Sequence, residues 1–129
     1  MKLIELNIDK IAALCKKYKV SRLWVFGSIL TPRFNDNSDV DFSVEFKYDL
    51  IDDLFVIFFD FIEELQTLLG RKVDVVDETA ISNRYFRKEL DATKVLIYGW
   101  KSTKISRLYT FLYQRFCIMT GLSNAKVSV

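Results

Sequence analysis

The sequence predicts a mixed α/β (α+β) fold, in which one mixed β-sheet is flanked by helices. Short runs rich in β-branched and aromatic residues, typical of strands, take turns with longer stretches whose apolar residues recur at helical spacing. Half of the 129 residues are hydrophobic and 15% are aromatic, which is enough for the core of one compact domain and argues against disorder.

Each element follows from a local pattern. Apolar residues three or four positions apart predict helices at residues 8–19, 48–69, 81–90 and 103–119. Alternating or β-branched residues predict strands at residues 20–26, 40–44, 73–76 and 95–98. A turn or short helix is expected over residues 28–37, which contain the only proline. Gly70 is placed to cap the long helix that ends at residue 69.

The composition excludes several kinds of site. The chain contains no histidine, so a histidine general base, a Ser-His triad and a histidine-containing zinc site are excluded. A metal would have to be held by carboxylates, which favours Mg²⁺ or Mn²⁺. Cys15 and Cys117 lie far apart without metal-like spacing, and both are expected to be reduced thiols of a cytoplasmic protein.

Charge is distributed unevenly along the chain. Residues 1–99 carry 14 basic and 17 acidic side chains, whereas residues 100–129 carry five basic side chains and no acidic one. The main body therefore lacks the basic surface of a nucleic-acid-binding domain. Five acidic residues interrupt the longest apolar region, residues 50–69, so no membrane helix is expected there, and residues 1–9 do not read as a signal peptide.

Two aspartates open the second predicted strand. Asp39 and Asp41 lie two positions apart, so on a strand their side chains point to one face, opposite the apolar face. Asp74 lies in the third predicted strand and would join them if the two strands are neighbours. Three like charges repel unless a cation neutralises them, and a divalent metal with oxygen ligands does so. The alternative is that each aspartate lies at a solvated strand end.

The pair Gly27-Ser28 ends the first predicted strand, and ten residues separate it from Asp39. Glycine has no Cβ to keep a ligand away, and Ser28 would start a helix whose free N–H groups favour a phosphate. A Gly-Ser pair alone is common in turns. Together with the facing carboxylates, the pair predicts a site for metal-assisted phosphoryl or nucleotidyl transfer.

This pattern of Gly-Ser, ten residues and Asp-x-Asp resembles that of the minimal nucleotidyltransferases (MNT proteins) of the DNA polymerase beta superfamily. The residues that match it are Gly27, Ser28, Ser38, Asp39, Asp41 and, as the third carboxylate on a later strand, Asp74. The resemblance covers roughly residues 8–99. It implies a polymerase-beta-like nucleotidyltransferase fold with a minimal domain at residues 1–99.

The resemblance also implies a catalytic mechanism. Asp39 and Asp41 would hold two Mg²⁺ ions that bridge the triphosphate of ATP. Asp74 would help to hold one ion and would activate the acceptor hydroxyl, which attacks the α-phosphate as pyrophosphate leaves. All three aspartates are thus implied to be both catalytic and metal-binding.

The nucleotide would be held by the Gly-Ser pair and by residues of the loop that leads to the Asp-x-Asp pair. The nucleotide-binding residues implied are Gly27, Ser28, Arg33 and Ser38. Many relatives carry basic residues and a glycine shortly after the Gly-Ser pair, where this chain has Ile29, Thr31 and Pro32. Arg33 is the nearest cation, and two alternatives stay open: it takes the place of these basic residues, or their absence makes catalysis weak.

The size of the chain narrows the class of acceptor. Larger members of the superfamily hold nucleic acid with extra domains, for which this chain has no room, whereas relatives of this size are usually antitoxins paired with a HEPN-domain ribonuclease toxin. The resemblance therefore implies an antitoxin that transfers AMP from ATP to a tyrosine of that toxin. Two alternatives stay open: a non-catalytic antitoxin that neutralises its toxin by binding, and a transferase that acts on a small molecule.

Two apolar segments have no assigned role. Residues 100–129 are expected to form a helical extension that folds back on the domain or binds a second copy or the toxin; a membrane-surface helix or nucleic-acid arm fits its sparse charge less well. The predicted helix at residues 48–69 is apolar on more than one face. This fits either burial between the sheet and another element or a protein-binding face.

Overall fold

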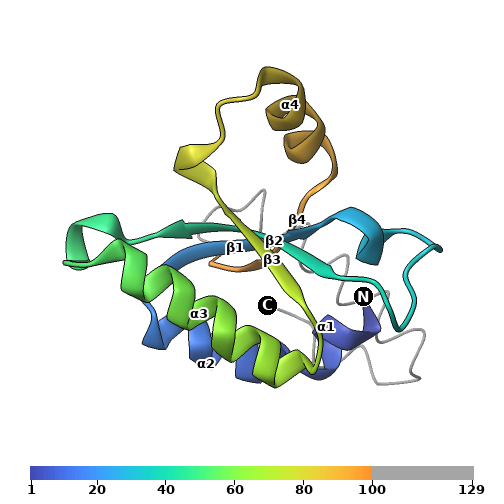
Figure 1. The fold of residues 1–129 in the computed structure, drawn as a ribbon, viewed down its shortest axis with the longest axis horizontal. Helices are drawn as coiled ribbons and strands as arrows, with labels where there is room; N and C mark the ends of the chain where they lie inside the picture. The colour runs from blue at the N-terminus through green and yellow to red at the C-terminus, as the bar shows by residue number, and fades with distance from the viewer. Residues whose placement is uncertain (100–129) are drawn as a thin grey trace, which may run out of the picture. The chain divides into compact units, whose positions relative to one another are not determined.

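The computed structural model describes residues 1–99, and the prediction of a helical extension at residues 100–129 lies outside this part. The helices are α1 (Lys2–Leu6), α2 (Ile8–Lys17), α3 (Leu54–Leu69) and α4 (Arg84–Thr93), and the strands are β1 (Val20–Phe26), β2 (Val40–Phe46), β3 (Val73–Asp77) and β4 (Val95–Tyr98). Helices α1, α2 and α3 lie on one side of the sheet and α4 lies on the other (Figure 1). The predicted mixed sheet flanked by helices is therefore confirmed.

The order of strands in the sheet is β3-β2-β1-β4. The central strand β1 pairs antiparallel with both β2 and β4, while β2 pairs parallel with β3. A parallel pair needs a crossover connection, and α3 supplies it between β2 and β3. This crossover brings the starts of β2 and β3 to the same end of the sheet.

The core lies between the sheet and the helices α2 and α3. Alternate residues of β2, namely Val40, Phe42 and Val44, are fully buried, as the alternating pattern predicts. They pack in one cluster with Phe61 of α3 and Cys15 of α2. Burial raises the pKa of the Cys15 thiol to about 12, so this cysteine is a core residue rather than a reactive one.

The long helix begins later than its apolar pattern predicts. Helix α3 starts at Leu54, because Asp53 caps it by accepting a hydrogen bond from the Val56 N–H at 3.2 Å. Residues Tyr48–Leu50 form a separate 3₁₀ turn, and the Tyr48 hydroxyl donates to Asp77 at the end of β3 (2.6 Å). A continuous apolar run therefore spans two elements, divided by a capping carboxylate.

Other boundaries show the same effect of caps. Gly70 ends α3 with a φ of 67°, as predicted, and its N–H donates to the Gln66 carbonyl at 2.8 Å. Helix α4 begins three residues after the predicted start, because Asn83 caps it through the Phe86 N–H (2.9 Å). The short helix α1 was not predicted. Strands β1 and β4 have the predicted bounds.

The first two turns of α3 are not buried within residues 1–99. Phe55 is 72% exposed and Phe59 is 51% exposed, and their rings lie against each other with centroids 4.6 Å apart. Leu54 and Val56 are also exposed, whereas Phe61, Leu65 and Leu69 further along are buried. Within residues 1–99 no element covers this end of α3, so both hypotheses, burial against a further element and a protein-binding face, stay predictions. No helix in this part is long and apolar enough to cross a membrane.

Candidate active site

The three predicted carboxylates come together at one end of the sheet. Asp41 of β2 and Asp74 of β3 occupy paired positions of the parallel ladder, and Asp39 immediately precedes β2. The expectation that Asp74 lies beside Asp41 on a neighbouring strand is confirmed. Burial raises the pKa of Asp41, and the negative charges of Asp74 and Asp39 raise it further. Negative charge at this end of the sheet is therefore only partly compensated.

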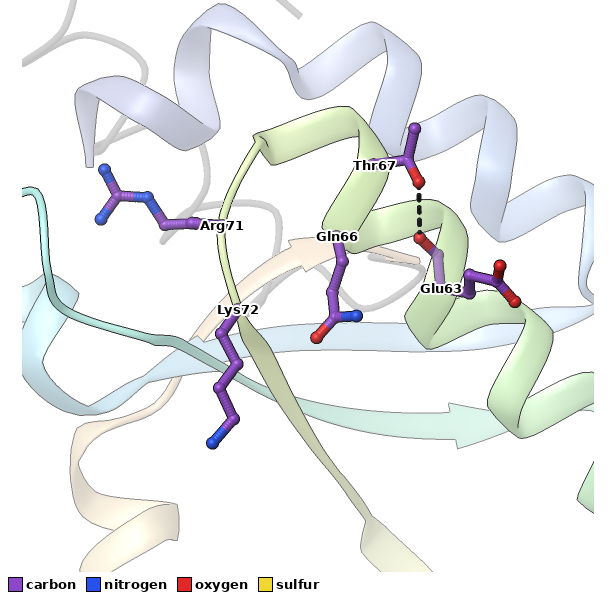
Figure 2. A pocket seen from close by; sticks show the side chains of 5 residues that line it. All are labelled: Glu63, Gln66, Thr67, Arg71 and Lys72. Atoms are coloured by element: carbon purple, nitrogen blue, oxygen red, sulfur yellow. Dashed lines mark hydrogen bonds between the residues drawn. The ribbon is translucent and has the colours of Figure 1, made fainter.

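A basic residue borders the same group. Lys72 precedes β3, and its Nζ atom lies 3.8 Å from Oδ2 of Asp39 in a pair that is largely exposed to solvent. Lys72 also lines an open polar pocket of about 400 Å³ (Figure 2). The other residues of this pocket are Glu63, Gln66, Thr67 and Arg71. An exposed ion pair of this length contributes little to stability.

The residues fit a divalent cation in the chemistry of their donor atoms. Their donors are all carboxylate oxygens, which Mg²⁺ prefers, and paired positions on adjacent strands place Asp41 and Asp74 side by side. Burial and, after it, the negative charges of Asp74 and Asp39 raise the pKa of Asp41, and a bound cation would offset the repulsion among these carboxylates. Within residues 1–99 no three such side chains already converge tightly around one point. A bound ion would have to draw the oxygens of Asp39, Asp41 and Asp74 together.

Gly27 lies directly against one of these carboxylates. It follows Phe26, which pairs with Asp41 across β1 and β2, and it has a φ of +80°. A Cβ at this position would overlap the Oδ2 atom of Asp41. Both the backbone angle and the close approach therefore require glycine. The Gly-Ser pair and the Asp-x-Asp pair, ten residues apart in sequence, meet at the end of two antiparallel strands.

Ser28 lies in a short 3₁₀ turn, Gly27–Leu30, which fits the prediction of a turn or short helix. The turn closes at Thr31, whose N–H and hydroxyl both donate to the Ser28 carbonyl, at 2.9 and 2.7 Å. A single turn contains too few aligned peptide units to produce the helix dipole that we expected to favour a phosphate. Phosphate binding here would rest on local N–H groups and the Ser28 hydroxyl.

The two other predicted nucleotide-binding residues differ in how the structure uses them. The Ser38 hydroxyl accepts a hydrogen bond from the Asn35 N–H at 3.1 Å and so shapes the loop before Asp39. Arg33 is exposed, and within residues 1–99 its guanidinium forms no hydrogen bond or ion pair. Their roles toward a nucleotide stay predictions.

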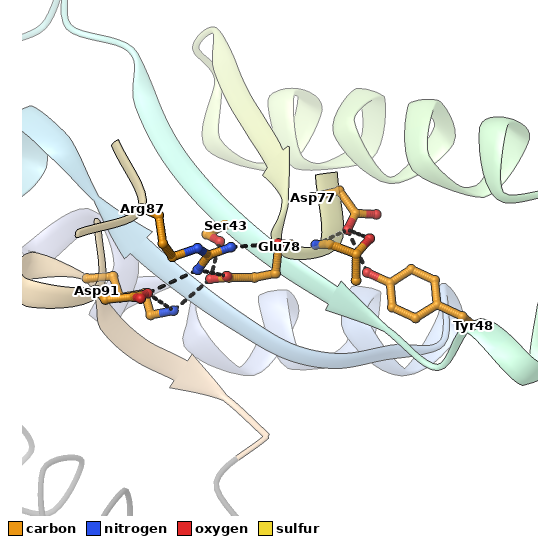
Figure 3. Close-up of polar contacts among 8 residues, drawn as sticks. Ser43, Tyr48, Asp77, Glu78, Arg87 and Asp91 are labelled. Carbon is orange, nitrogen blue, oxygen red and sulfur yellow. Dashed lines mark hydrogen bonds and ion pairs between the residues drawn. The ribbon is translucent and has the colours of Figure 1, made fainter. Parts of the chain in front are cut away.

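A charged network that the sequence analysis missed lies on the same face of the sheet, beneath α4 (Figure 3). The buried hydroxyl of Ser43 donates to Glu78 at 2.6 Å, and Lys94 donates to the same carboxylate at 2.8 Å. Arg87 pairs with both Glu78 and Asp91. Burial opposes ionisation of Glu78, but the hydrogen bonds from Lys94, Ser43 and Arg87 outweigh it and lower its pKa.

This network fixes α4 over the sheet. The Lys94 ammonium lies 4.2 Å from the centre of the Trp24 ring, and Phe86 packs on Phe26, just before Gly27. Because Arg87 is held by two carboxylates, it is not free to reach a nucleotide. The spacing of Arg87, Asp91 and Lys94 by four and three residues was the available sequence signal.

Strand-borne carboxylates beside a Gly-Ser turn are the arrangement predicted for a nucleotidyltransferase, and comparison with known proteins identifies the family of the chain. The family described as "Polymerase beta, Nucleotidyltransferase" matches residues 9–103. The chain therefore belongs to the polymerase beta nucleotidyltransferase family.

Individual relatives are small proteins of the same kind. The chain is 37% identical over 82 residues, 64% of its length, to a protein of Methanocaldococcus jannaschii named as a protein adenylyltransferase, of which it covers 81%. A solved minimal nucleotidyltransferase matches with a TM-score of 0.61 and 22% identity, over 73% of this chain and 92% of that one. A Shewanella oneidensis MNT antitoxin–HEPN toxin complex, whose toxin is tri-AMPylated, matches with a TM-score of 0.56 and 18% identity, over 89% of this chain and 90% of the other.

Proposed function

We propose that this nucleotidyltransferase is the antitoxin of a HEPN/MNT pair and transfers AMP from ATP to a tyrosine of its HEPN-domain toxin in the presence of Mg²⁺. The observation that carries the proposal is the pairing of Asp41 with Asp74, with Gly27 packed against Asp41. The acceptor rests on likeness to the relatives named above, one of which is a protein adenylyltransferase by name and another a complex with an AMPylated toxin.

The reaction assigns a task to each part of the site. The toxin hydroxyl would attack the α-phosphorus of ATP, and the bond from that phosphorus to the β-phosphate oxygen would break, releasing pyrophosphate. Asp74, on the β3 side, would accept the proton of the hydroxyl. Ser28 and the backbone at Gly27, on the β1 side, would hold the β- and γ-phosphates.

Magnesium would be held by Asp39, Asp41 and Asp74, and when bound it stabilises charge on the attacking and leaving oxygens. Asp41 would be the ligand nearest the phosphates, because it lies against the Gly27 backbone and in the position paired with Asp74. Arg33 would supply positive charge to the phosphates from the loop after Ser28. The buried network under α4 would hold this helix on the same face of the sheet as the three aspartates.

The test is to express the full chain with the product of the adjacent gene, add Mg²⁺ and ATP, and weigh both proteins. The expected result is a mass increase of the partner by whole AMP units, on a tyrosine. An Asp39→Asn/Asp41→Asn double variant is expected to abolish the increase. Asp36→Asn, an exposed aspartate of the same loop, is the matched control and is expected to keep it.

The outcomes separate the proposal from its alternatives. An unchanged partner mass, with toxicity still suppressed by the double variant, would show that the chain neutralises its toxin by binding alone. An unmodified partner together with pyrophosphate release in the presence of small hydroxyl compounds would instead indicate a small-molecule acceptor. Either result would reject protein AMPylation.

A further inference from the structure

The loop over residues 34–38 carries the chain into β2 and ends one residue before Asp39. Its internal hydrogen bonds are local: the Ser38 N–H donates to the Asn35 carbonyl and the Asn35 N–H donates to the Ser38 hydroxyl, each at 3.1 Å. The Asn37 N–H also donates to the Asn35 side chain at 2.8 Å. Such bonds fix the shape of a turn but not its place relative to the sheet.

Arg71 connects this loop to the rest of the site. Its Nη1 atom donates to the carbonyl oxygens of Asn35 and Ser38, both at 3.0 Å. Its guanidinium also lies 4.7 Å from the centre of the Phe34 ring. Within residues 1–99, these are the side-chain hydrogen bonds that reach the loop from outside it. Figure 2 shows Arg71 extending from the turn that joins α3 to β3.

The turn that carries Arg71 is itself anchored on both sides. Gly70 ends α3 in the left-handed conformation, and the Val73 N–H at the start of β3 donates to the Gln66 side chain at 3.2 Å. The Lys72 carbonyl accepts a hydrogen bond from the Val40 N–H at 3.1 Å, which joins the starts of β2 and β3. Arg71 therefore holds the loop from a fixed point beside Asp74.

We propose that Arg71 is a positioning residue: by holding the carbonyls of Asn35 and Ser38 it sets where Asp39 lies relative to Asp41 and Asp74. The inference rests on the proposed function, because it concerns the same carboxylates as cation ligands. The contacts of Arg71 within residues 1–99 are with the loop carbonyls and the Phe34 ring, not with the three carboxylates. It acts through the loop, as groups outside the ligand set orient metal ligands in other proteins.

Two effects of removing Arg71 have opposite signs, which makes the inference testable. Losing a nearby positive charge would by itself strengthen cation binding. Losing the clamp on the loop would weaken it by about tenfold, as is typical for groups that orient metal ligands. The proposal therefore expects Arg71→Met to weaken cation binding, whereas Lys72→Met, which removes the charge beside Asp39 but leaves the loop clamped, should leave it equal or tighter.

The experiment measures Mn²⁺ affinity by titration, and amide hydrogen exchange of the metal-free full chain, for the wild type and the variants. Arg71→Met is expected to lose about tenfold in Mn²⁺ affinity and to speed exchange at residues 35–39, while the core strands stay protected. Arg71→Lys, whose ammonium can reach a carbonyl, is expected to recover part of both and serves as the milder variant. Asp39→Asn establishes that wild-type Mn²⁺ binding is at this site.

The results distinguish failure of the inference from failure of the proposed function. If the wild type binds Mn²⁺ and Asp39→Asn does not, but Arg71→Met binds as well as the wild type, the positioning role is wrong and the proposed site stands. Faster loop exchange without a change in affinity would also overturn the inference. If the wild type binds no Mn²⁺, the proposed site and the inference fall together.

Discussion

Gly27 has a backbone φ of +80° and lies against Asp41, so a single substitution at this residue can test the proposed cation site. Gly27→Ala would force a left-handed alanine, at a cost of about 1 kcal/mol in unfolding free energy, and its methyl would displace the Asp41 carboxylate. We expect Mn²⁺ affinity to fall by about tenfold, measured by titration on protein that is shown to be folded.

Gly70→Ala is the matched control for this substitution. Gly70 also has a left-handed φ, of +67°, but nothing lies within 4 Å of the place where its Cβ would be. The change should cost a similar free energy of unfolding and leave Mn²⁺ affinity intact. If both variants lost affinity equally, the loss at Gly27 would reflect strain rather than contact with Asp41.

Asp41 and Asp74 are like charges in paired positions, an arrangement that destabilises a sheet unless a cation is present. The metal-free Asp41→Asn variant is therefore expected to melt a few degrees above the wild type, since about 0.5 kcal/mol moves the melting temperature of a small domain by roughly 2–4 °C. The raised pKa of Asp41 points the same way. Thermal unfolding with and without Mg²⁺ checks this.

Glu45→Gln provides the comparison, because Glu45 lies on the same strand and face but pairs with Arg22 at 3.5 Å. It should not raise the melting temperature. A gain of stability in both variants would indicate a general benefit of removing negative charge. A loss in Asp41→Asn would mean that Asp41 has a counter-charge in the free protein.

At the residue scale, sequence patterns predicted some site residues and not others, for a physical reason. Asp39 and Asp41 share a face because a strand repeats every two residues, which is a local property. Their meeting with Asp74 depends on which strands pair, and this is decided by the crossover through α3. Arg71 contacts carbonyl groups far away in sequence, and no residue pattern specifies such contacts.

At the scale of elements, local sequence patterns predicted the strands, whereas the ends of helices depend on the folded conformation. Strands β1 and β4 were predicted with their observed bounds, because β-branched and aromatic residues mark them throughout. The start of α3 was misplaced because the apolar run continues through Asp53, whose capping role depends on its conformation. Periodicity thus gives the existence of an element, and side-chain caps give its ends.

Helix α4 depends on one buried carboxylate for its attachment to the sheet. The Glu78 side chain is 9% exposed and accepts from Ser43, Lys94 and Arg87. Glu78→Gln would leave Arg87 and Lys94 with Asp91 as the one carboxylate they both contact within residues 1–99. We expect a loss of about 2 kcal/mol in unfolding free energy, measured with denaturant. Glu89→Gln, at an exposed position of α4, should change stability by less than about 0.5 kcal/mol.

The pH dependence of this attachment has a defined sign. The folded-state pKa of Glu78 is lowered, so its stabilising effect is fully present above the unfolded value near 4.5 and is lost as pH falls through the folded pKa. The wild type should therefore lose stability faster than Glu78→Gln on acidification below about pH 4.5. Parallel acid-unfolding curves for the two proteins would contradict this assignment.

At the scale of the whole molecule, the core described here is built within residues 1–99. One cluster of buried residues extends from Ile4 to Ile97 and includes residues of α2, α3 and all four strands. Every group of the candidate site lies in the same range, from Gly27 to Lys94. The division into a domain at residues 1–99 and an extension at residues 100–129 stays a prediction, and this distribution is consistent with it.

A chain that ends at Gly99 is therefore expected to fold by itself. Gly99 follows β4 with a φ of +92°, and a Cβ at this position would overlap the Ser21 carbonyl oxygen of β1. We expect cooperative unfolding and wild-type Mn²⁺ affinity, because the truncated chain keeps the whole buried cluster described here and all three carboxylates. Non-cooperative unfolding would show that residues 100–129 complete the core. Cooperative unfolding with weakened Mn²⁺ binding would instead assign part of the cation site to the extension.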